Sequence, residues 1–255
     1  MILRKENIYA YHNAKITNVN DQRMERDFIQ SMFDAIAPRY DVLNRLLSMR
    51  QDVYWRRRLV AAMDLGQNAR VLDAACGTGD VMLEIWRQKP EARVCGIDFS
   101  TEMLGIAARK IRQAGKTPRG QLLAADVLHP PFAQQSFDGI SIAFGIRNIT
   151  RRDLALAQFF SLLRPGGIMA VLELSTPRPE ALRRLYLLYF RKILPAIGGL
   201  FSKNMRAYHY LPESVLNFPR PVAFAGSMET AGFTDVGWKS LSAGIATLYT
   251  GRRPL

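Results

Sequence analysis

The segment that most restricts the fold is residues 70–80, where an apolar run passes through two glycines into a helical pattern. Arg70–Ala74 reads as a buried strand, Gly77 and Gly79 follow in a turn, and a helical period starts at Val81. Glycines at such a junction let a ligand approach bare backbone at the carboxyl end of the strand. We therefore expect an α/β fold with a nucleotide-like ligand at this loop.

Short apolar strands and helices continue to alternate beyond this loop. Further strands are expected at residues 93–97, 121–124, 139–143 and 168–174, and helices at 81–88, 101–114 and 153–163, the last ended by a turn at 165–167. Such alternation predicts a mostly parallel sheet. A helix at 222–231 and two strand-like runs, 236–241 and 245–250, follow; the two runs are close enough for an antiparallel hairpin. The prediction is a Rossmann-like sheet of seven strands.

The segments outside this alternation have other patterns. Residues 1–25 show no clear apolar period and are expected to be frayed or disordered. Residues 26–65 predict a helical cap, broken at Pro38 and near Ser48. Residues 178–220 predict an insertion that begins with a basic, aromatic helix running to about residue 197. We expect a single domain over residues 26–255, to which the cap and the insertion belong.

Composition limits the setting in which the chain works. Its 255 residues contain 35 Lys and Arg against 22 Asp and Glu, and this net charge of +13 favours nucleic acid or an anionic membrane as a neighbour. Two cysteines form no disulfide scaffold, and the sequence has neither a signal peptide nor an apolar run of membrane-spanning length. Three widely separated histidines suggest no metal site. These features predict a cytoplasmic protein without a metal.

Carboxylates at successive strand ends narrow the class of ligand. Asp98 ends the second strand 19 positions after Gly79, about the spacing at which a carboxylate accepts from ribose hydroxyls. Asp126 follows the third strand and can accept from an adenine amine. Met82 stands where a dinucleotide fingerprint has its third glycine, and no P-loop lysine follows. Each feature alone could be a tight turn or a helix cap. The glycine loop and the two carboxylates together favour an adenosine without a phosphate chain, such as S-adenosylmethionine, as the ligand.

Five stretches of the chain match one known family. They are residues 33–44, 73–80, 137–148, 163–167 and 208–214. On these motifs the chain resembles the ubiquinone/menaquinone biosynthesis C-methyltransferases, class I S-adenosylmethionine-dependent enzymes that methylate a ring carbon of a polyprenylated quinol. The resemblance covers nearly everything after residue 25, and residues 40–41, 144–148 and 208–214 are its most specific elements.

The resemblance implies a set of cofactor contacts. Besides Asp73, Gly77 and Gly79 of the first loop, they fall on Thr78, Asp98, Asp126, Val127 and Ala143. The family often has Asn-Ala at positions 126–127 and Ser at 143, so this chain keeps an acceptor at 126 and lacks a hydroxyl at 143. The implied reaction converts demethylmenaquinol to menaquinol. Methylation of a 2-methoxy-6-polyprenyl-benzoquinol is the alternative.

Methylation of a ring carbon requires that the neighbouring hydroxyl lose its proton, which makes the carbon electron-rich. Arg147 and Asn148 follow the fourth strand. We expect Arg147 to stabilise the phenolate, directly or through a water, because its pKa is too high for a base, and Asn148 to orient the ring oxygen. Tyr40 and Asp41 are expected to close the pocket and position the quinol, with simple packing and helix capping as the alternative.

The insertion and the positive net charge indicate which partners the protein is expected to bind. Basic residues flank a Tyr, Phe and Leu cluster in 181–194, which predicts a helix on the inner face of an anionic membrane, over a lipid-lined substrate entrance; packing on its own domain is the alternative. Trp55 with Arg56–Arg58 suggests a basic surface or a second membrane contact. Whether the chain forms a homodimer stays open. An RNA methyltransferase would also fit the positive net charge. Residues 144–148 lack the Pro-Pro-aromatic loop that is typical of enzymes that methylate a base nitrogen, so no nucleic acid partner is expected. A second alternative is a non-catalytic scaffold, and the presence of Arg147 and Asn148 argues against it.

Overall fold

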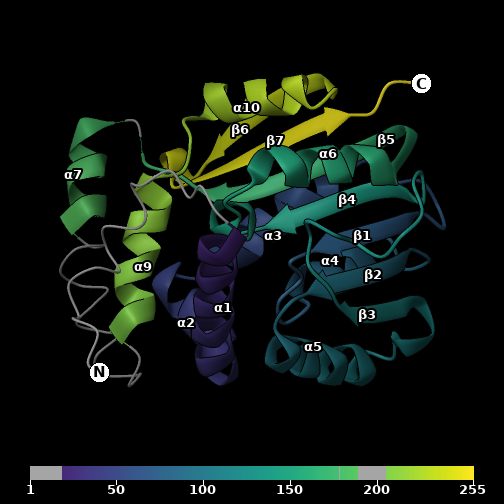
Figure 1. Cartoon of the computed structure of the whole chain (residues 1–255), viewed down its shortest axis with the longest axis horizontal. Coiled ribbons are helices and arrows are strands. Elements are labelled where there is room, and N and C mark those ends of the chain that lie inside the picture. The colour runs from purple at the N-terminus through teal and green to yellow at the C-terminus, as the bar shows by residue number, and fades with distance from the viewer. Residues whose placement is uncertain (1–18, 178, 189–204) are drawn as a thin grey trace.

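A computed structural model describes residues 19–177, 179–188 and 205–255, and its centre is one seven-stranded sheet (Figure 1). The strands are β1 (Arg70–Ala74), β2 (Arg93–Asp98), β3 (Gly120–Ala124), β4 (Phe137–Ala143), β5 (Leu163–Leu174), β6 (Thr234–Leu241) and β7 (Ala246–Arg252). Their order is β3-β2-β1-β4-β5-β7-β6; β1 to β5 are parallel, and β7 is antiparallel to both β5 and β6. The predicted sheet and its terminal hairpin are confirmed. The carboxyl ends of β1 to β5 therefore share one edge.

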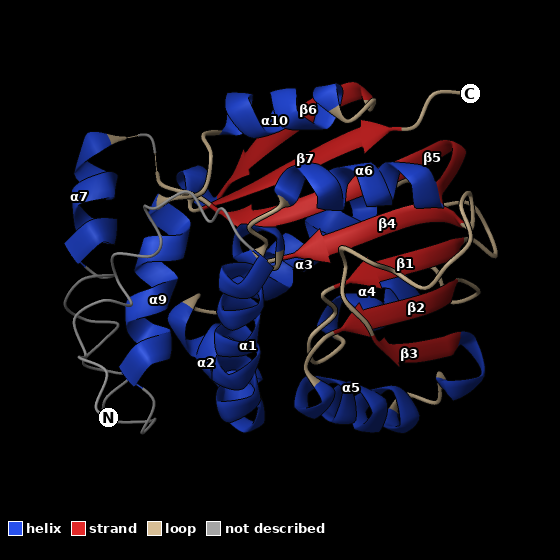
Figure 2. Cartoon of the chain, viewed as in Figure 1, coloured by secondary structure: helices blue, strands red, loops and turns tan. Residues whose placement is uncertain are grey.

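Helices cover both faces of this sheet (Figure 2). They are α3 (Gln51–Ala62), α4 (Asp80–Gln88) and α5 (Thr101–Gln113) on one face, and α6 (Arg152–Leu162) and α10 (Pro221–Thr230) on the other. Single 3-10 turns lie at η1 (Ala37–Arg39), η2 (Thr117–Arg119), η3 (Ile146–Asn148) and η5 (Ser242–Gly244). Two buried layers result, one with Leu59 and Met82, the other with Phe159, Phe224 and Tyr249. Burial of this apolar surface holds the strand ends in fixed positions.

The cap consists of α1 (Val19–Ile36), η1, α2 (Tyr40–Leu47) and α3. Both predicted breaks occur: Pro38 lies within the 3-10 turn η1, and after Ser48 the chain turns through left-handed backbone at Met49 and Arg50. Residues 19–25, the last part of the segment expected to be frayed or disordered, belong to α1. Extending a helix already held by packing costs little, even in a polar sequence. Residues 1–18 lie outside the described residues.

The insertion contributes α7 (Glu180–Leu188) and α9 (Met205–Leu216). The predicted continuation of the first helix towards residue 197 lies outside the described residues. The sequence did not predict α9, because Pro212 inside it reads as a helix breaker. The turn expected at 165–167 is likewise part of β5, where Gly166 adopts a φ of 75° and the pairing with β4 shifts register. Glycine permits this bulge without ending the strand.

Candidate active site

The loop between β1 and α4 presents backbone to open space. Ala75, Gly77 and Gly79 have φ values of 51°, 54° and 80°. A Cβ built on Gly77 meets no atom within 4 Å, whereas one on Gly79 lies 3.2 Å from the Cβ of Ala107 on α5. Gly79 thus allows the loop to pack closely against α5, and Gly77 leaves room for a ligand to contact the backbone of the loop.

Asp73, near the end of β1, carries a buried acceptor that lacks a protein partner. Its Oδ1 accepts from the Ser141 hydroxyl at 2.7 Å, and its Oδ2 has no hydrogen bond. Burial raises the pKa of Asp73 to about 7. A positively charged ligand nearby would favour the ionised form. These features fit S-adenosylmethionine, which carries an ammonium and a sulfonium.

Asp98 joins the loop to the next strand end. It is buried, and its Oδ2 and Oδ1 accept from the backbone N–H groups of Gly77 at 2.8 Å and Ser100 at 2.9 Å. Burial raises its pKa, against the opposing effect of these N–H donors. Each carboxylate oxygen has a second lone pair, so Asp98 keeps acceptor capacity for ribose hydroxyls. It both fixes the loop and remains a candidate ligand.

The other expected cofactor residues follow neighbouring strands. Asp126 lies after β3, where its Oδ1 accepts from the Leu128 N–H at 2.9 Å and its Oδ2 pairs with Arg26 of α1 at 3.3 Å. Val127 is buried beside it, and Ala143 ends β4, next to β1. The structure therefore brings all these residues to one edge of the sheet.

Asp41 faces the cofactor loop. Its Oδ1 accepts from the buried Thr78 hydroxyl at 2.6 Å, and its Oδ2 pairs with Lys110 of α5 at 2.9 Å. Lys110 also reaches the Thr78 hydroxyl at 3.2 Å and forms an ion pair with Asp80. Asp41 is absent from the residues that line the cavity described next, and in this structure its side chain contacts the loop and Lys110. A contact between Asp41 and the quinol stays a prediction.

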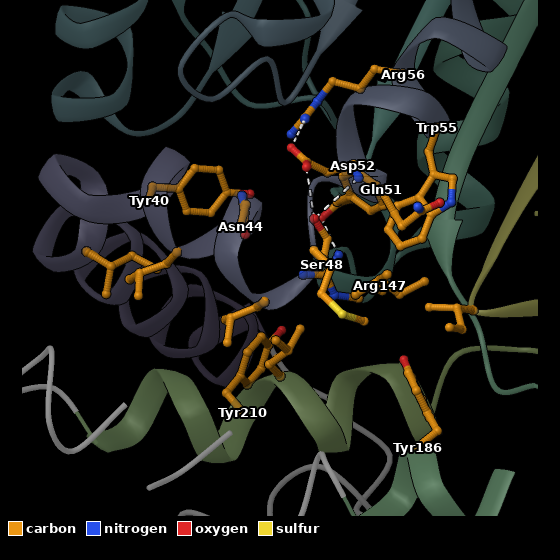
Figure 3. Close-up of a pocket in the computed structure, with 18 of the residues that line it drawn as sticks. Tyr40, Asn44, Ser48, Gln51, Asp52, Trp55, Arg56, Arg147, Tyr186 and Tyr210 are labelled. Carbon is orange, nitrogen blue, oxygen red and sulfur yellow. Dashed lines mark hydrogen bonds and ion pairs between the residues drawn. The ribbon is translucent and has the colours of Figure 1, made fainter. Parts of the chain in front are cut away.

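A cavity of about 370 Å³ lies between the cap, the insertion helices and the ends of β4 and β5 (Figure 3). Its walls are apolar and include Met32, Phe33, Ile36, Leu43, Leu174, Leu182 and Leu211. Polar side chains from several elements also line it, and the labelled set in Figure 3 includes Tyr40, Ser48, Asp52, Arg56, Arg147 and Tyr210. The cavity suits an apolar molecule that carries a polar ring.

Arg147 supplies a buried positive charge to this cavity. Its Nη1 donates to Glu173 Oε1 at 2.8 Å and to the carbonyl of Phe144, and its backbone N–H donates to Glu173 Oε2 at 3.1 Å. Burial lowers the pKa of Arg147, but the charge and hydrogen bond of Glu173 together with the nearby Tyr40 and Tyr210 outweigh burial, and the pKa is raised. Its Nε has no hydrogen-bond partner. The Arg147 guanidinium is therefore held in place by Glu173, and its Nε–H group is left to donate to a ligand.

Tyr40 and Asn148 differ in their access to the cavity. Tyr40 lines it, and burial raises its pKa despite the opposing charge of Arg147, so the phenol stays protonated at neutral pH. Asn148 is outside the lining, and its Oδ1 accepts from the Tyr210 hydroxyl at 3.0 Å. Tyr210 is thus the side chain through which Asn148 reaches the cavity.

Comparison with known proteins identifies the family. Residues 16–253 match the model of the ubiE/COQ5 methyltransferase family. The chain belongs to this family. It is 47% identical to the ubiquinone/menaquinone biosynthesis C-methyltransferase UbiE of Geotalea daltonii, over 88% of this chain and 96% of that one. It is 45% identical to the demethylmenaquinone methyltransferase of Thermus thermophilus, over 88% of this chain and all of that one.

Solved structures agree on the fold. The [4+2]-cyclase SpnF matches with a TM-score of 0.65 at 17% identity, over 89% of this chain and 96% of that one. A phosphoethanolamine N-methyltransferase 2 of Haemonchus contortus, solved with S-adenosyl-L-methionine, matches with a TM-score of 0.59 at 13% identity, over 78% of this chain and 52% of that one. The predicted class I fold and family are confirmed, and the chain is an S-adenosylmethionine-dependent C-methyltransferase.

In this family member, α3 contributes a buried polar cluster that sequence reasoning missed. Asp52 accepts from Ser48 at 2.8 Å and pairs with Arg56 at 2.5 Å, and the Arg56 guanidinium lies 5.6 Å from the ring centroid of Phe144. The interpretation of residues 55–58 as a basic surface is wrong for Trp55 and Arg56, which are buried. The spacing of Asp52 and Arg56, four residues apart on a helix, was the available signal.

Proposed function

We propose that the protein methylates a ring carbon of a polyprenylated quinol, with demethylmenaquinol as its main substrate. One observation carries this proposal: an apolar cavity holds a buried cation, Arg147, with a spare N–H donor. A quinolate ring with an isoprenoid tail matches both properties. The names of the Geotalea and Thermus relatives point to the same substrate class.

In the proposed reaction the bound S-adenosylmethionine supplies an electrophilic methyl group. The ring hydroxyl next to the reacting carbon gives its proton to solvent, and Arg147 stabilises the resulting phenolate. The ring carbon then forms a bond to the methyl carbon as the methyl–sulfur bond breaks, which yields S-adenosylhomocysteine. The ring C–H proton leaves to water and the ring regains aromaticity. The pairing with Glu173 fixes the guanidinium in place for this step.

Two tyrosines assist in binding the ring. Tyr40, kept protonated by burial, donates a hydrogen bond to a quinol oxygen. Asn148 acts as a positioning residue for Tyr210, because its Oδ1 accepts a hydrogen bond from the Tyr210 hydroxyl at 3.0 Å. The isoprenoid tail lies along the apolar walls, which Met32, Phe33 and Leu43 help to form.

We further propose that the mouth of this cavity rests on the inner face of an anionic membrane. Met49 of the α2–α3 turn and Leu185 of α7 line the cavity, yet are 81% and 64% exposed. The neighbouring Val42 and Leu46 are also exposed, and the net charge of +13 favours anionic lipid. Within the described part of the chain, no helix is long and apolar enough to cross a membrane.

The test measures the transfer of a labelled methyl group from S-adenosylmethionine to the quinol. Purified enzyme is given reduced demethylmenaquinone or reduced 2-methoxy-6-polyprenyl-benzoquinone in anionic liposomes, in separate reactions. We expect label in the naphthoquinol, and a loss of at least about 100-fold in rate with Arg147→Ala. Arg87→Ala, which removes an exposed arginine of α4, is the control. Cofactor binding without label in either quinol would overturn the proposal.

A further inference from the structure

Helix α1 holds the two loops that follow β2 and β3. Gln30 donates from Nε2 to the carbonyl of Phe99 at 3.0 Å, and Asp34 accepts from the Ser100 hydroxyl at 2.5 Å. Arg26 completes the row with its contact to Asp126. These three residues are spaced i, i+4 and i+8, so they share one side of the helix.

A different side of the same helix forms a wall of the cavity. Met32 and Ile36, a second i, i+4 pair, line it, and the ring of Phe28 lies 6.4 Å from that of Tyr210 on α9. Figure 1 shows α1 standing between α9 and the α5 end of the sheet, and α1 contacts both helices. The helix therefore separates the cofactor loops from the cavity and touches both.

We infer that α1 couples the two binding sites, with Gln30 and Asp34 as positioning residues for the cofactor loops. An isoprenoid tail packed against Met32 and Ile36 restrains the helix. The restrained helix holds Phe99 and Ser100, which adjoin Asp98, in the conformation that binds the adenosine. Each ligand then tightens the binding of the other by the same factor. This inference rests on the proposed function.

The experiment measures the affinity for S-adenosylhomocysteine with and without a quinol in detergent micelles. Two quinols are used: reduced demethylmenaquinone with a short isoprenoid tail, and naphthoquinol with no tail. We expect the tailed quinol to lower the Kd of the wild type by about fivefold or more. The tailless quinol is expected to lower it less than twofold.

The variants separate coupling from simple folding effects. Gln30→Ala and Asp34→Ala should abolish the tail-dependent change, whereas Asp34→Asn, which keeps an acceptor for Ser100, should retain it. Ser31→Ala is the matched control, because the Ser31 hydroxyl donates to the carbonyl of Phe28 in its own helix. Thermal unfolding of each variant shows whether it is folded.

Coupling that persists in both alanine variants, or that is equal for the two quinols, would overturn the inference. Methyl transfer to the tailed quinol is measured with the same protein samples. Absence of transfer in the wild type contradicts the proposed function, whereas transfer without coupling contradicts only the role of α1.

Discussion

Arg147 and Glu173 form an ion pair in which Nη1 and Oε1 are 2.8 Å apart and both side chains are buried. Glu173 also receives the backbone N–H groups of Arg147 and Leu174, so it holds the 3-10 turn after β4 as well as the guanidinium. A buried charge without its partner is costly. The pair thus ties the position of the cation to the integrity of the sheet.

Glu173→Gln should lower the free energy of unfolding by about 3–5 kcal/mol, because it leaves the Arg147 charge uncompensated. Urea unfolding measures this. Glu180→Gln on α7 is the control, since Glu180 pairs with the exposed Arg183 and Arg184 at the surface, and the loss of stability should be below about 0.5 kcal/mol. Equal effects of the two substitutions would contradict the importance of the buried pair.

Asp41→Ala should act on the cofactor and leave the chemical step nearly unchanged. Because Asp41 holds the Thr78 hydroxyl and Lys110, its loss is expected to raise the KM for S-adenosylmethionine about tenfold, as expected for a lost hydrogen bond to a charged group. Steady-state kinetics at saturating quinol give both constants. A large fall in kcat with an unchanged KM would instead place Asp41 at the quinol.

Gly96 on β2 lies behind the cofactor loop with no room for a side chain. A Cβ there would be 2.6 Å from the Met82 sulfur and 2.8 Å from the Cys76 sulfur. Gly96→Ala should therefore destabilise the fold by about 1–3 kcal/mol and weaken binding of S-adenosylhomocysteine. Gly105→Ala on α5, where a Cβ meets nothing within 4 Å, should be neutral or stabilising. Urea unfolding of both variants gives the comparison.

Much of the sheet and the first loop could be predicted because the signals are local. The apolar run from Val71 and the two glycines at 77 and 79 specify a strand, a turn and a helix within a few residues. The same holds for the carboxylates at strand ends, since parallel strands bring their carboxyl ends to one edge. Such features need no knowledge of distant contacts.

The direction of a side chain on the cap could not be predicted in this way. Whether Asp41 faces the cofactor loop or the cavity depends on how α2 docks against Thr78, 37 positions away. The burial of Arg56 could not be predicted either, because two exposed arginines follow it and the three together indicate a basic surface. Helix α9 was not predicted because it contains Pro212, and proline normally interrupts a helix; here tertiary packing tolerates it.

The raised pKa of Asp73 makes stability depend on pH in a specific direction. Its folded pKa of about 7 exceeds the ordinary value of 3.8, so between these values the unfolded state has released the proton and the folded state retains it. The contribution of Asp73 to the stability of the folded state therefore falls as pH rises from about 4 to 7. Asp73→Asn should remove this contribution, so the difference in unfolding free energy between wild type and variant should change over that range. A pH-independent difference would contradict the raised pKa.

Membrane contact predicts that charge at the cavity mouth abolishes lipid binding. Val42→Asp combined with Leu46→Asp, two exposed positions of α2 outside the cavity lining, should reduce cosedimentation with anionic vesicles and slow methylation of a quinol embedded in them, because both side chains would lose their insertion into lipid. Val222→Asp on α10, an exposed position outside the cavity lining, is the matched control. Methylation of a short-tailed quinol in detergent should stay near the wild-type rate. Equal vesicle binding by the wild type and the double variant would show that this surface does not meet the membrane.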